Sequence, residues 1–403
     1  MAASFLNYTE SKSSAIKQAI LGKFINEGTD SIAEISREIG VSIPTITKLV
    51  GELIEDGLIE EVGKLGTTGG RRPSIYGLNP SAGYIVGVEI RLHHISMAIT
   101  NFKGEIIDFQ EDIAYTLESS EESFRAFCTF LKNLVDKTGI DRSKVLAYGF
   151  NLSGRVNNET GYCFSYFIGE DRPVSQVFKE ELGAWVFVEN DSRAMTYGEY
   201  ICGIGNNEKN MLFLNVSWGL GMGMIIDGKL SYGKSGFSGE IGHFPMLDNN
   251  HICQCGKTGC LETGASGSAA HRIVMQKLSE GRASILSETL KKNGHISIDD
   301  IIRAVNEEDV LAIEVIEEIG RTLGRAIAGL INLFNPELVV IGGKISEAKD
   351  YLMLPIKSAV QKHSLNMINK DTTLKFSKLG KKCGPIGACM LSRSKMLGLL
   401  KAK

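Results

Sequence analysis

The chain has 403 residues, of which 43% are hydrophobic and 23% charged, a composition typical of a globular protein with two or three domains. Its net charge of −3 excludes a general electrostatic attraction to nucleic acid or anionic membranes. No run approaches the roughly 18 consecutive apolar residues of a membrane helix, and the N-terminus lacks a signal-peptide pattern. We therefore expect a cytoplasmic protein whose cysteines stay reduced.

The first eighty residues predict a winged helix-turn-helix. Residues 13–25 carry apolar side chains at helical spacing. A second helix follows Ser31, a predicted N-cap with Glu34 as its capping-box partner. Gly40 ends this helix, and a short turn leads to a third one. Helix, turn and helix form the pattern in which the second helix of the pair enters the major groove of DNA.

Two short β-prone stretches after these helices flank a tip rich in Gly and Thr, as in a β-wing. The third helix carries hydroxyl and ammonium groups and the wing is locally basic, so we expect contacts to phosphates and bases. The predicted DNA contacts are Ser42, Thr45, Thr47, Lys48, Lys64, Arg71 and Arg72. The alternative is a small helical docking domain whose Gly-Gly-Arg-Arg tip is a solvated loop.

From Gly83 onward the pattern changes to strands that alternate with helices, with glycine turns at strand ends. A second run of strands repeats the order of the first, which predicts a two-lobed α/β protein with a cleft between the lobes. We expect a DNA-binding domain over residues 1–80 and a first α/β lobe over 81–195 plus a C-terminal helix at 384–403. A second α/β lobe, with the metal site described next, is expected over 196–383.

Three cysteines follow His243 closely in the stretch GEIGHFPMLDNNHICQCGKTGCLETG, residues 239–264. Thiolates and imidazole are the ligands that zinc favours, and four of them complete a tetrahedral shell with no open position for water. The predicted zinc ligands are His243, Cys253, Cys255 and Cys260. Unliganded reduced thiols and a disulfide are the alternatives. Glu240 and Glu262 flank the ligands, and a metal that fixes two carboxylates and an imidazole can shape a pocket for a polyol.

The motif GEIGH followed by CxCGxxGCLE resembles the signature of the ROK family, which groups bacterial sugar-responsive repressors with sugar kinases; the likeness covers essentially the whole chain. The resemblance implies an actin-like, hexokinase-related fold and a zinc ion held by the histidine and three cysteines. It also implies sugar contacts from Asn190, Asp191, Glu240, His243 and Glu262, with Asp191 at the position of the kinases' catalytic base. An amide and carboxylates also suit a neutral polyol on chemical grounds. The alternative for Asp191 is a helix N-cap after the strand VFVEN.

The two turns that cradle phosphate in the family's kinases are altered here. Where the kinases carry D-x-G-G-T, this chain reads Glu89-Ile90-Arg91-Leu92-His93. Where they carry G-T-G-x-G, it reads Ser217-Trp218-Gly219-Leu220-Gly221. Phosphate binding needs flexible glycines whose N–H groups approach the oxygens, plus a hydroxyl, so we expect nucleotide binding to be lost. Arg193, where the kinases often have Asn, is expected to face away from the sugar.

Altered phosphate turns beside an intact sugar side, joined to a DNA-binding domain, predict a sugar-responsive transcriptional regulator and not an enzyme. A repressor of carbohydrate-utilisation genes is the expected form. A homodimer or homotetramer would read two half-sites of operator DNA, and an effector sugar in the interlobe cleft would change their spacing. The alternatives are a sugar kinase with a DNA-binding extension and a regulator controlled by a protein partner.

Overall fold

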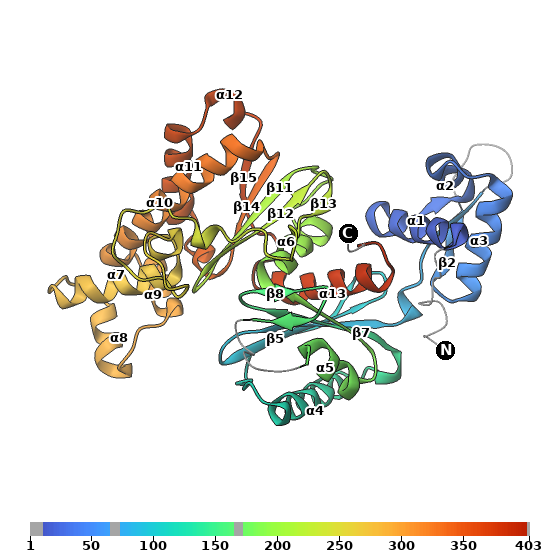
Figure 1. The fold of residues 1–403 in the computed structure, drawn as a ribbon, viewed down its shortest axis with the longest axis horizontal. Helices are drawn as coiled ribbons and strands as arrows, with labels where there is room; N and C mark the ends of the chain where they lie inside the picture. Colours follow the sequence, from blue (N-terminus) through green and yellow to red (C-terminus); the bar gives the residue numbers. More distant parts are fainter. Residues whose placement is uncertain (1–10, 65–72, 165–171, 401–403) are drawn as a thin grey trace. The chain divides into compact units, whose positions relative to one another are not determined.

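The computed structural model describes residues 11–64, 73–164 and 172–400. The chain divides into two compact units, one of Met1–Asp191 with Gly384–Lys403 and one of Ser192–Cys383 (Figure 1). In the described ranges, no helix combines the length and the apolar character that a membrane crossing requires. The domain boundaries expected from the sequence stay predictions.

The N-terminal part of the first unit is a helical bundle followed by a small sheet. The helices are α1 (Lys12–Glu27), α2 (Ile32–Ile39) and α3 (Ile43–Glu55). The strands β1 (Asp30–Ser31), β2 (Ile59–Lys64) and β3 (Ser74–Leu78) pair in the order β1-β3-β2. Buried apolar side chains from all three helices form its core: Ile20, Phe24, Ile35, Ile46, Leu49 and Leu53. This is the predicted winged helix-turn-helix, with β2 and β3 as the wing strands.

The two ends of α2 show how far local sequence determines this domain. Gly40 ends α2 in the left-handed conformation, with φ 70°, as predicted. Ser31 is the N-cap, and its side chain accepts from the Glu34 N–H. The reciprocal half of the capping box is wrong, because the Ser31 N–H donates to Asp30 Oδ1 at 2.7 Å. The Glu34 carboxylate pairs with Arg37 instead.

The rest of the first unit is a mixed sheet with helices on both faces (Figure 1). Its strands run in the order β10-β7-β4-β5-β6. They are β4 (Tyr84–Ile90), β5 (His94–Asn101), β6 (Ile106–Ala114), β7 (Val145–Leu152) and β10 (Trp185–Asn190). α4 (Glu121–Lys137) and α5 (Val174–Leu182) cover one face through an aromatic cluster of Phe124, Phe127, Phe150 and Phe178. A short pair, β8 (Val156–Asn157) and β9 (Tyr162–Cys163), follows β7.

The C-terminal helix α13 (Cys383–Met396) covers the other face of this sheet. Gly87 of β4 and Gly149 of β7 permit the close approach. A Cβ atom at Gly87 would lie 2.1 Å from the Pro385 carbonyl oxygen, and one at Gly149 would lie 2.5 Å from that of Ala388. Any larger residue at either position would push α13 off the sheet.

The second unit repeats the topology of the first. Its strands are β11 (Met211–Val216), β12 (Leu220–Ile226), β13 (Lys229–Leu230), β14 (Leu338–Gly342) and β15 (Thr373–Phe376), in the order β13-β12-β11-β14-β15. In both sheets an antiparallel meander, β4-β5-β6 or β11-β12-β13, receives two parallel strands beside its first strand. The prediction of two lobes built alike is therefore confirmed at the level of strand order.

The helices of the second unit are α6 (Asp191–Cys202), α7 (Gly267–Ser279), α8 (Leu286–Asn293), α9 (Ile298–Asn306), α10 (Val310–Phe334), α11 (Asp350–His363) and α12 (Asn366–Asn369). All of them except α6 contribute to the largest apolar cluster described. α10 contributes an apolar stripe that includes Ile316, Ile319, Leu323 and Ile327. Its packing fixes α7, and hence the chain segment that follows the predicted metal ligands.

Candidate functional site

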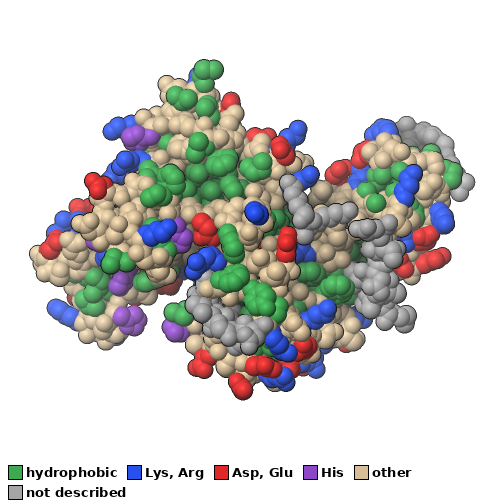
Figure 2. All heavy atoms as spheres, viewed as in Figure 1, with side chains coloured by type: hydrophobic (Ala, Val, Ile, Leu, Met, Phe, Trp, Pro, Cys, Tyr) green, Lys and Arg blue, Asp and Glu red, His purple; other side chains and the backbone are tan. Residues whose placement is uncertain are grey.

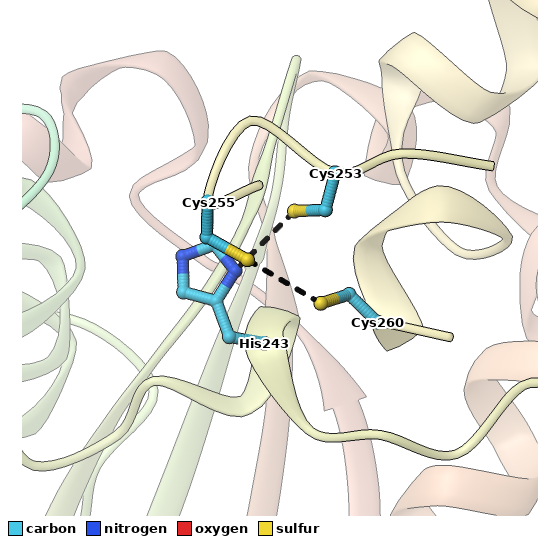
Figure 3. A group of neighbouring side chains, drawn as sticks. All are labelled: His243, Cys253, Cys255 and Cys260. Carbon is cyan, nitrogen blue, oxygen red and sulfur yellow. Dashed lines mark hydrogen bonds between the residues drawn. The ribbon is translucent and has the colours of Figure 1, made fainter. Parts of the chain in front are cut away.

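The predicted metal ligands converge in the second unit. His243 ends the short 3₁₀ turn Ile241–His243, and Cys260 precedes a second one, Leu261–Thr263. Cys253 and Cys255 come from the loop between them. One ligand atom from each of the four residues lies within 4.8 Å of the other three, and Figure 3 shows the side chains turned toward one another. The cluster can therefore hold a metal ion.

Backbone hydrogen bonds and glycines build the loop that carries these ligands. The Cys253 N–H donates to the Lys257 carbonyl and the Gly256 N–H to that of Cys253, both at 2.8 Å, which closes a tight knuckle. Gly256 and Gly259 adopt φ 83° and 77°, the left-handed region that glycine reaches without strain. The two glycines thus let the chain turn between the cysteines.

The chemistry of the donor set fits zinc. Three thiols and one imidazole form the closed donor set typical of structural zinc sites. Cys253 Sγ lies 3.5 Å from His243 Nδ1, and the Sγ atoms of Cys255 and Cys260 are 3.6 Å apart. The backbone N–H of Lys257 lowers the pKa of the Cys255 thiol, which favours the thiolate that a metal binds.

Two glutamates flank the cluster and connect it to the sheet. Glu240 Oε2 lies 3.8 Å from His243 Nε2, on the opposite side of the ring from Cys253. A carboxylate next to the outer nitrogen of a metal-ligating histidine orients the ring. Glu262 accepts the Leu220 N–H at 2.9 Å through Oε2. Its Oε1 lies 3.7 Å from Cys253 Sγ. The two carboxylates thus border the metal ligands without belonging to the cluster.

The other two predicted sugar contacts lie at the end of the first unit. Asn190 ends β10, and Asp191 is the first residue of α6, where a negative charge interacts favourably with the helix N-terminus. Asp191 accepts from Ser153 Oγ and from Asn190 Nδ2, both at 2.9 Å. Sequence reasoning missed Ser153, although its position directly after the carboxyl end of β7 is a signal for a site residue.

The first altered turn carries Arg91, which contacts polar side chains of the sheet. Glu89 is buried, and Arg91 Nε lies 3.7 Å from its carboxylate. Arg91 Nη2 donates to Ser96 Oγ at 2.8 Å and to Asp112 Oδ1 at 2.9 Å. Burial raises the pKa of Glu89 from 4.5 to about 7, although the Arg91 charge opposes the rise. Arg91, at a glycine position of the kinase pattern, is therefore bound to side chains of the sheet.

The second altered turn caps a helix. The carbonyls of Ser217 and Trp218 accept the Gly267 and Ser268 N–H groups at 2.7 and 2.9 Å, at the start of α7. The Trp218 ring packs against His271, with centroids 5.7 Å apart. The turn is thus fixed by α7 and carries an indole at the position of the kinases' threonine.

The predicted DNA contacts on the recognition helix share its exposed face. Ser42, Thr45, Thr47 and Lys48 are exposed, whereas Ile46, Leu49, Val50 and Leu53 are buried. Lys64 is exposed at the end of β2. Arg71 and Arg72 lie outside the described residues. Over the face seen in Figure 2, Lys and Arg are interspersed with Asp and Glu, so attraction to DNA depends on local groups.

Arg193 is almost fully buried in the second unit. Its guanidinium lies over the Tyr232 ring, 5.8 Å from the centroid, in a cation–π arrangement. This gives Arg193 a structural role within its own unit; its predicted orientation relative to a sugar stays a prediction.

The chain begins with a winged helix-turn-helix and continues with two α/β sheets of matching strand order, one of which lies beside a Cys/His cluster. This combination is that of a DNA-binding protein whose remaining residues have an actin-like fold. A sequence model of the ROK family matches residues 85–395, and one described as winged helix-turn-helix DNA-binding matches residues 15–60. The chain belongs to the ROK family, as predicted.

Relatives of two kinds match this chain. A putative xylose repressor of Caldicellulosiruptor sp. is 28% identical over 94% of this chain and 96% of its own length. A glucokinase of Halalkalibacterium halodurans is 33% identical over 75% of this chain and 93% of its own length. The crystal structure of a ROK family transcriptional regulator, a homologue of the E. coli MLC protein, has a TM-score of 0.81 at 28% identity and covers 96% of this chain and 98% of its own. The predicted fold class is confirmed.

Proposed function

We propose that this protein is a sugar-responsive transcriptional regulator that represses genes of carbohydrate use. The observation that carries the proposal is a winged helix-turn-helix joined to a first turn that lacks the kinases' glycines and places Arg91 in ion pairs with Glu89 and Asp112. Similarity to a repressor over 94% of the chain, against 75% for a glucokinase, supports the same conclusion.

DNA recognition is assigned to α3 and the wing. Ser42, Thr45, Thr47 and Lys48 would face the major groove, because the opposite side of α3 is buried in the domain. Lys64, Arg71 and Arg72 would contact phosphates from the wing. A homodimer or homotetramer would place two such domains on half-sites about one helical turn, or a multiple of it, apart.

Zinc is the proposed metal of the Cys/His cluster. His243, Cys253, Cys255 and Cys260 would hold it, and it would supply rigidity to the loop with no open position for catalysis. Because Nδ1 of His243 faces the thiols, Nε2 would remain on the side of Glu240, where it can serve a sugar hydroxyl. The metal would in this way fix one part of the effector site.

The effector is proposed to be a neutral sugar or a sugar derivative. Glu240, His243 and Glu262 in the second unit, and Asn190 and Asp191 at the end of the first, are the proposed contacts. Carboxylates accept hydrogen bonds from sugar hydroxyls, and an amide both donates and accepts. The sugar would change DNA affinity only through its different affinity for the DNA-bound and DNA-free conformations, a coupling typically of about 1–3 kcal/mol.

A thermal-shift screen of hexoses, pentoses, amino sugars and their phosphates, with each hit repeated in a DNA-binding assay, tests this function. We expect at least one sugar to stabilise the protein and to change its affinity for promoter DNA. The same sugar should fail with Glu240→Gln. If no sugar binds, a regulator controlled by a protein partner becomes the better explanation.

The kinase alternative is tested separately by measuring ATP turnover with the same sugars. We expect no turnover above background, because Arg91 and Trp218 replace a glycine and the threonine of the kinases' phosphate turns and are bound to other side chains. Robust turnover that disappears in Asp191→Asn would contradict a purely regulatory protein.

A further inference from the structure

A polar pocket of about 440 Å³ lies in the second unit, apart from the proposed sugar contacts. Its wall comes from residues 247–251 of the loop before the cysteines, from α7 and the residues just before it, and from α10 near Glu318 and Thr322. Glu240 and Glu262 do not line it. Small-molecule sites in proteins usually have volumes of about 300–1,000 Å³, so the space suits a compact metabolite.

Two cations, Arg272 and Lys277, line this pocket and make no direct ion pair with any described residue. Arg272 is half-buried in α7, and burial lowers the pKa of its guanidinium. Its Nη2 donates to the Thr263 carbonyl at 2.8 Å, a neutral acceptor. Within the described ranges, neither Arg272 nor Lys277 has a carboxylate within ion-pair distance. The Glu318 charge opposes this pKa shift, but from beyond ion-pair distance, so an anionic ligand would add charge-assisted hydrogen bonds that the guanidinium does not make in the free protein.

Neighbouring arginines on the same unit behave differently. Arg282 pairs with Glu314 at 2.8 Å, and Arg321 pairs with Glu317 at 3.3 Å. Neither pair lines the pocket. These two arginines thus have direct acidic partners, whereas Arg272 and Lys277 have none within ion-pair distance among the described residues.

The acidic and amide groups of the pocket are arranged for hydroxyls. Asp248, Glu280 and Glu318 are exposed, whereas Arg272 and Lys277 are half-buried, so the cations lie deeper than the carboxylates. Water screens exposed carboxylates, which reduces their repulsion of a bound anion. Carboxylate and amide oxygens accept hydrogen bonds from hydroxyl groups, and the amide NH2 groups of Asn249 and Gln276 at the wall can donate to them.

We propose that this pocket binds a small anionic polyol, a phosphorylated or carboxylated sugar, with its anionic group on Arg272 and Lys277 and its hydroxyls toward the rim. The planar guanidinium offers paired N–H donors that match phosphate and carboxylate oxygens. The pocket is a second ligand site, distinct from the one proposed for the effector sugar.

The pocket is connected to the metal-bearing loop by direct hydrogen bonds. Thr263 accepts from Asn249 Nδ2 at 3.1 Å and donates to the Cys260 carbonyl at 2.8 Å. Its own carbonyl accepts from Arg272. A ligand that binds Arg272 or Asn249 can therefore shift Thr263, which lies next to Glu262 and is hydrogen-bonded to Cys260. We expect the anionic polyol to change the affinity of the effector sugar; this coupling, unlike the binding itself, rests on the proposed function.

Calorimetric titration of the full-length, metal-loaded protein tests the binding. The probes are glucose 6-phosphate, glucuronate, inorganic phosphate and glucose, each also titrated into Glu240→Gln. We expect an anionic sugar to bind, and to bind equally well to Glu240→Gln, because Glu240 does not line the pocket. Phosphate alone should bind less tightly than the sugar phosphate, since it lacks hydroxyls.

Substitutions assign the site. Arg272→Gln should weaken binding of the anionic sugar about tenfold or more, because a charge-assisted bidentate contact is lost. Arg321→Gln makes the same chemical change outside the pocket and should leave binding unaltered. If Arg272→Gln fails to fold, Lys277→Gln provides the test, because the Lys277 side chain makes no hydrogen bond or ion pair within the described ranges. A severalfold loss is expected there.

Three results would overturn the proposal. The first is that no anionic sugar binds the wild type. The second is binding that Glu240→Gln abolishes and that Arg272→Gln and Lys277→Gln leave intact, which would place the ligand in the effector site. The third is equal affinity for phosphate and the sugar phosphate, which would show that the pocket does not recognise the sugar hydroxyls. Failure of the effector sugar to bind, with the anionic sugar still bound, would contradict the proposed function and leave this site standing.

Discussion

The turn at Glu89–His93 and the metal-bearing loop at 239–262 gather reactive side chains in opposite ways. In the turn, Arg91 contacts two carboxylates and a hydroxyl of its own unit. In the loop, three thiols and an imidazole converge within 4.8 Å as a set that can hold a metal ion. Substitutions in the turn should therefore change stability and little else, whereas substitutions in the loop should change what the protein binds.

The largest effect is expected from Cys255→Ser. A serine hydroxyl is a poor zinc ligand, so the protein should lose its metal together with the folding free energy that the metal contributes. We expect a loss on the order of several kcal/mol, or roughly 10 °C or more in the melting temperature. Metal analysis and thermal denaturation measure both effects, and the sugar response should disappear as well.

Cys202→Ser is the matched control for this change, because Cys202 is exposed and lies outside the cluster. It should keep the metal and the melting temperature. A Cys255→Ser protein that melts normally and still responds to sugar without metal would show that the cluster has no structural role.

Glu89→Gln should be the next largest change, in the stabilising direction. The pKa of Glu89 is about 7 in the folded chain against 4.5 ordinarily, so the folded protein holds this proton more tightly than the unfolded one. Its contribution to stability is full below pH 4.5 and is lost as the pH rises to about 7, a difference of about 3 kcal/mol. The glutamine side chain of Glu89→Gln does not ionise, so the variant should not lose this stability as the pH rises.

Denaturation with urea at pH 5 and pH 8 checks this prediction for Glu89. The variant should gain stability relative to the wild type at pH 8 and gain little at pH 5. An equal gain or loss at both pH values would show that Glu89 does not titrate in this range.

Local signals predicted much of the fold from the sequence. Ser31 and Gly40 mark the two ends of α2. Glycine turns follow several strands, and the close spacing of the cysteines requires a tight turn of the chain. Each of these signals depends on residues that are near one another in the chain, and the structure confirms them.

Contacts between distant residues were not predictable in the same way. Arg91 donates a hydrogen bond to Asp112, which is 21 residues away in the chain. The sequence therefore predicted the loss of the glycines from this turn but not the partners of Arg91. The further pocket joins segments from Leu247 to Thr322 and has no local motif. α11 also has a weak local signal, because Pro355 lies inside it and interrupts the helical pattern.

Arg91→Ala should cost about 1–2 kcal/mol of folding free energy at pH 8, because it leaves the buried Glu89 carboxylate without its cation. The ion pair with Asp112 is half-exposed and should add little. A double-mutant cycle with Glu89→Gln measures the coupling, and most of the loss should vanish in the Glu89→Gln background. Additive effects of the two substitutions would show that Arg91 and Glu89 do not form a stabilising ion pair.

Lys48→Ala should have the smallest effect on the free energy of folding and should reduce DNA affinity instead. Glu52 lies 2.8 Å from Lys17 and 3.8 Å from Lys48, and the Lys17 hydrogen bond is the main cause of the lowered pKa of Glu52. The Lys48 ammonium therefore interacts only weakly with Glu52 and remains available to bind a DNA phosphate. In titrations of random-sequence duplex DNA at several salt concentrations, Lys48→Ala should lower the salt dependence by about one phosphate contact. Lys17→Ala should do the reverse, with lower thermal stability and an unchanged salt slope. If Lys48→Ala lowers stability and leaves DNA binding intact, the exposed face of α3 is not the DNA-binding face.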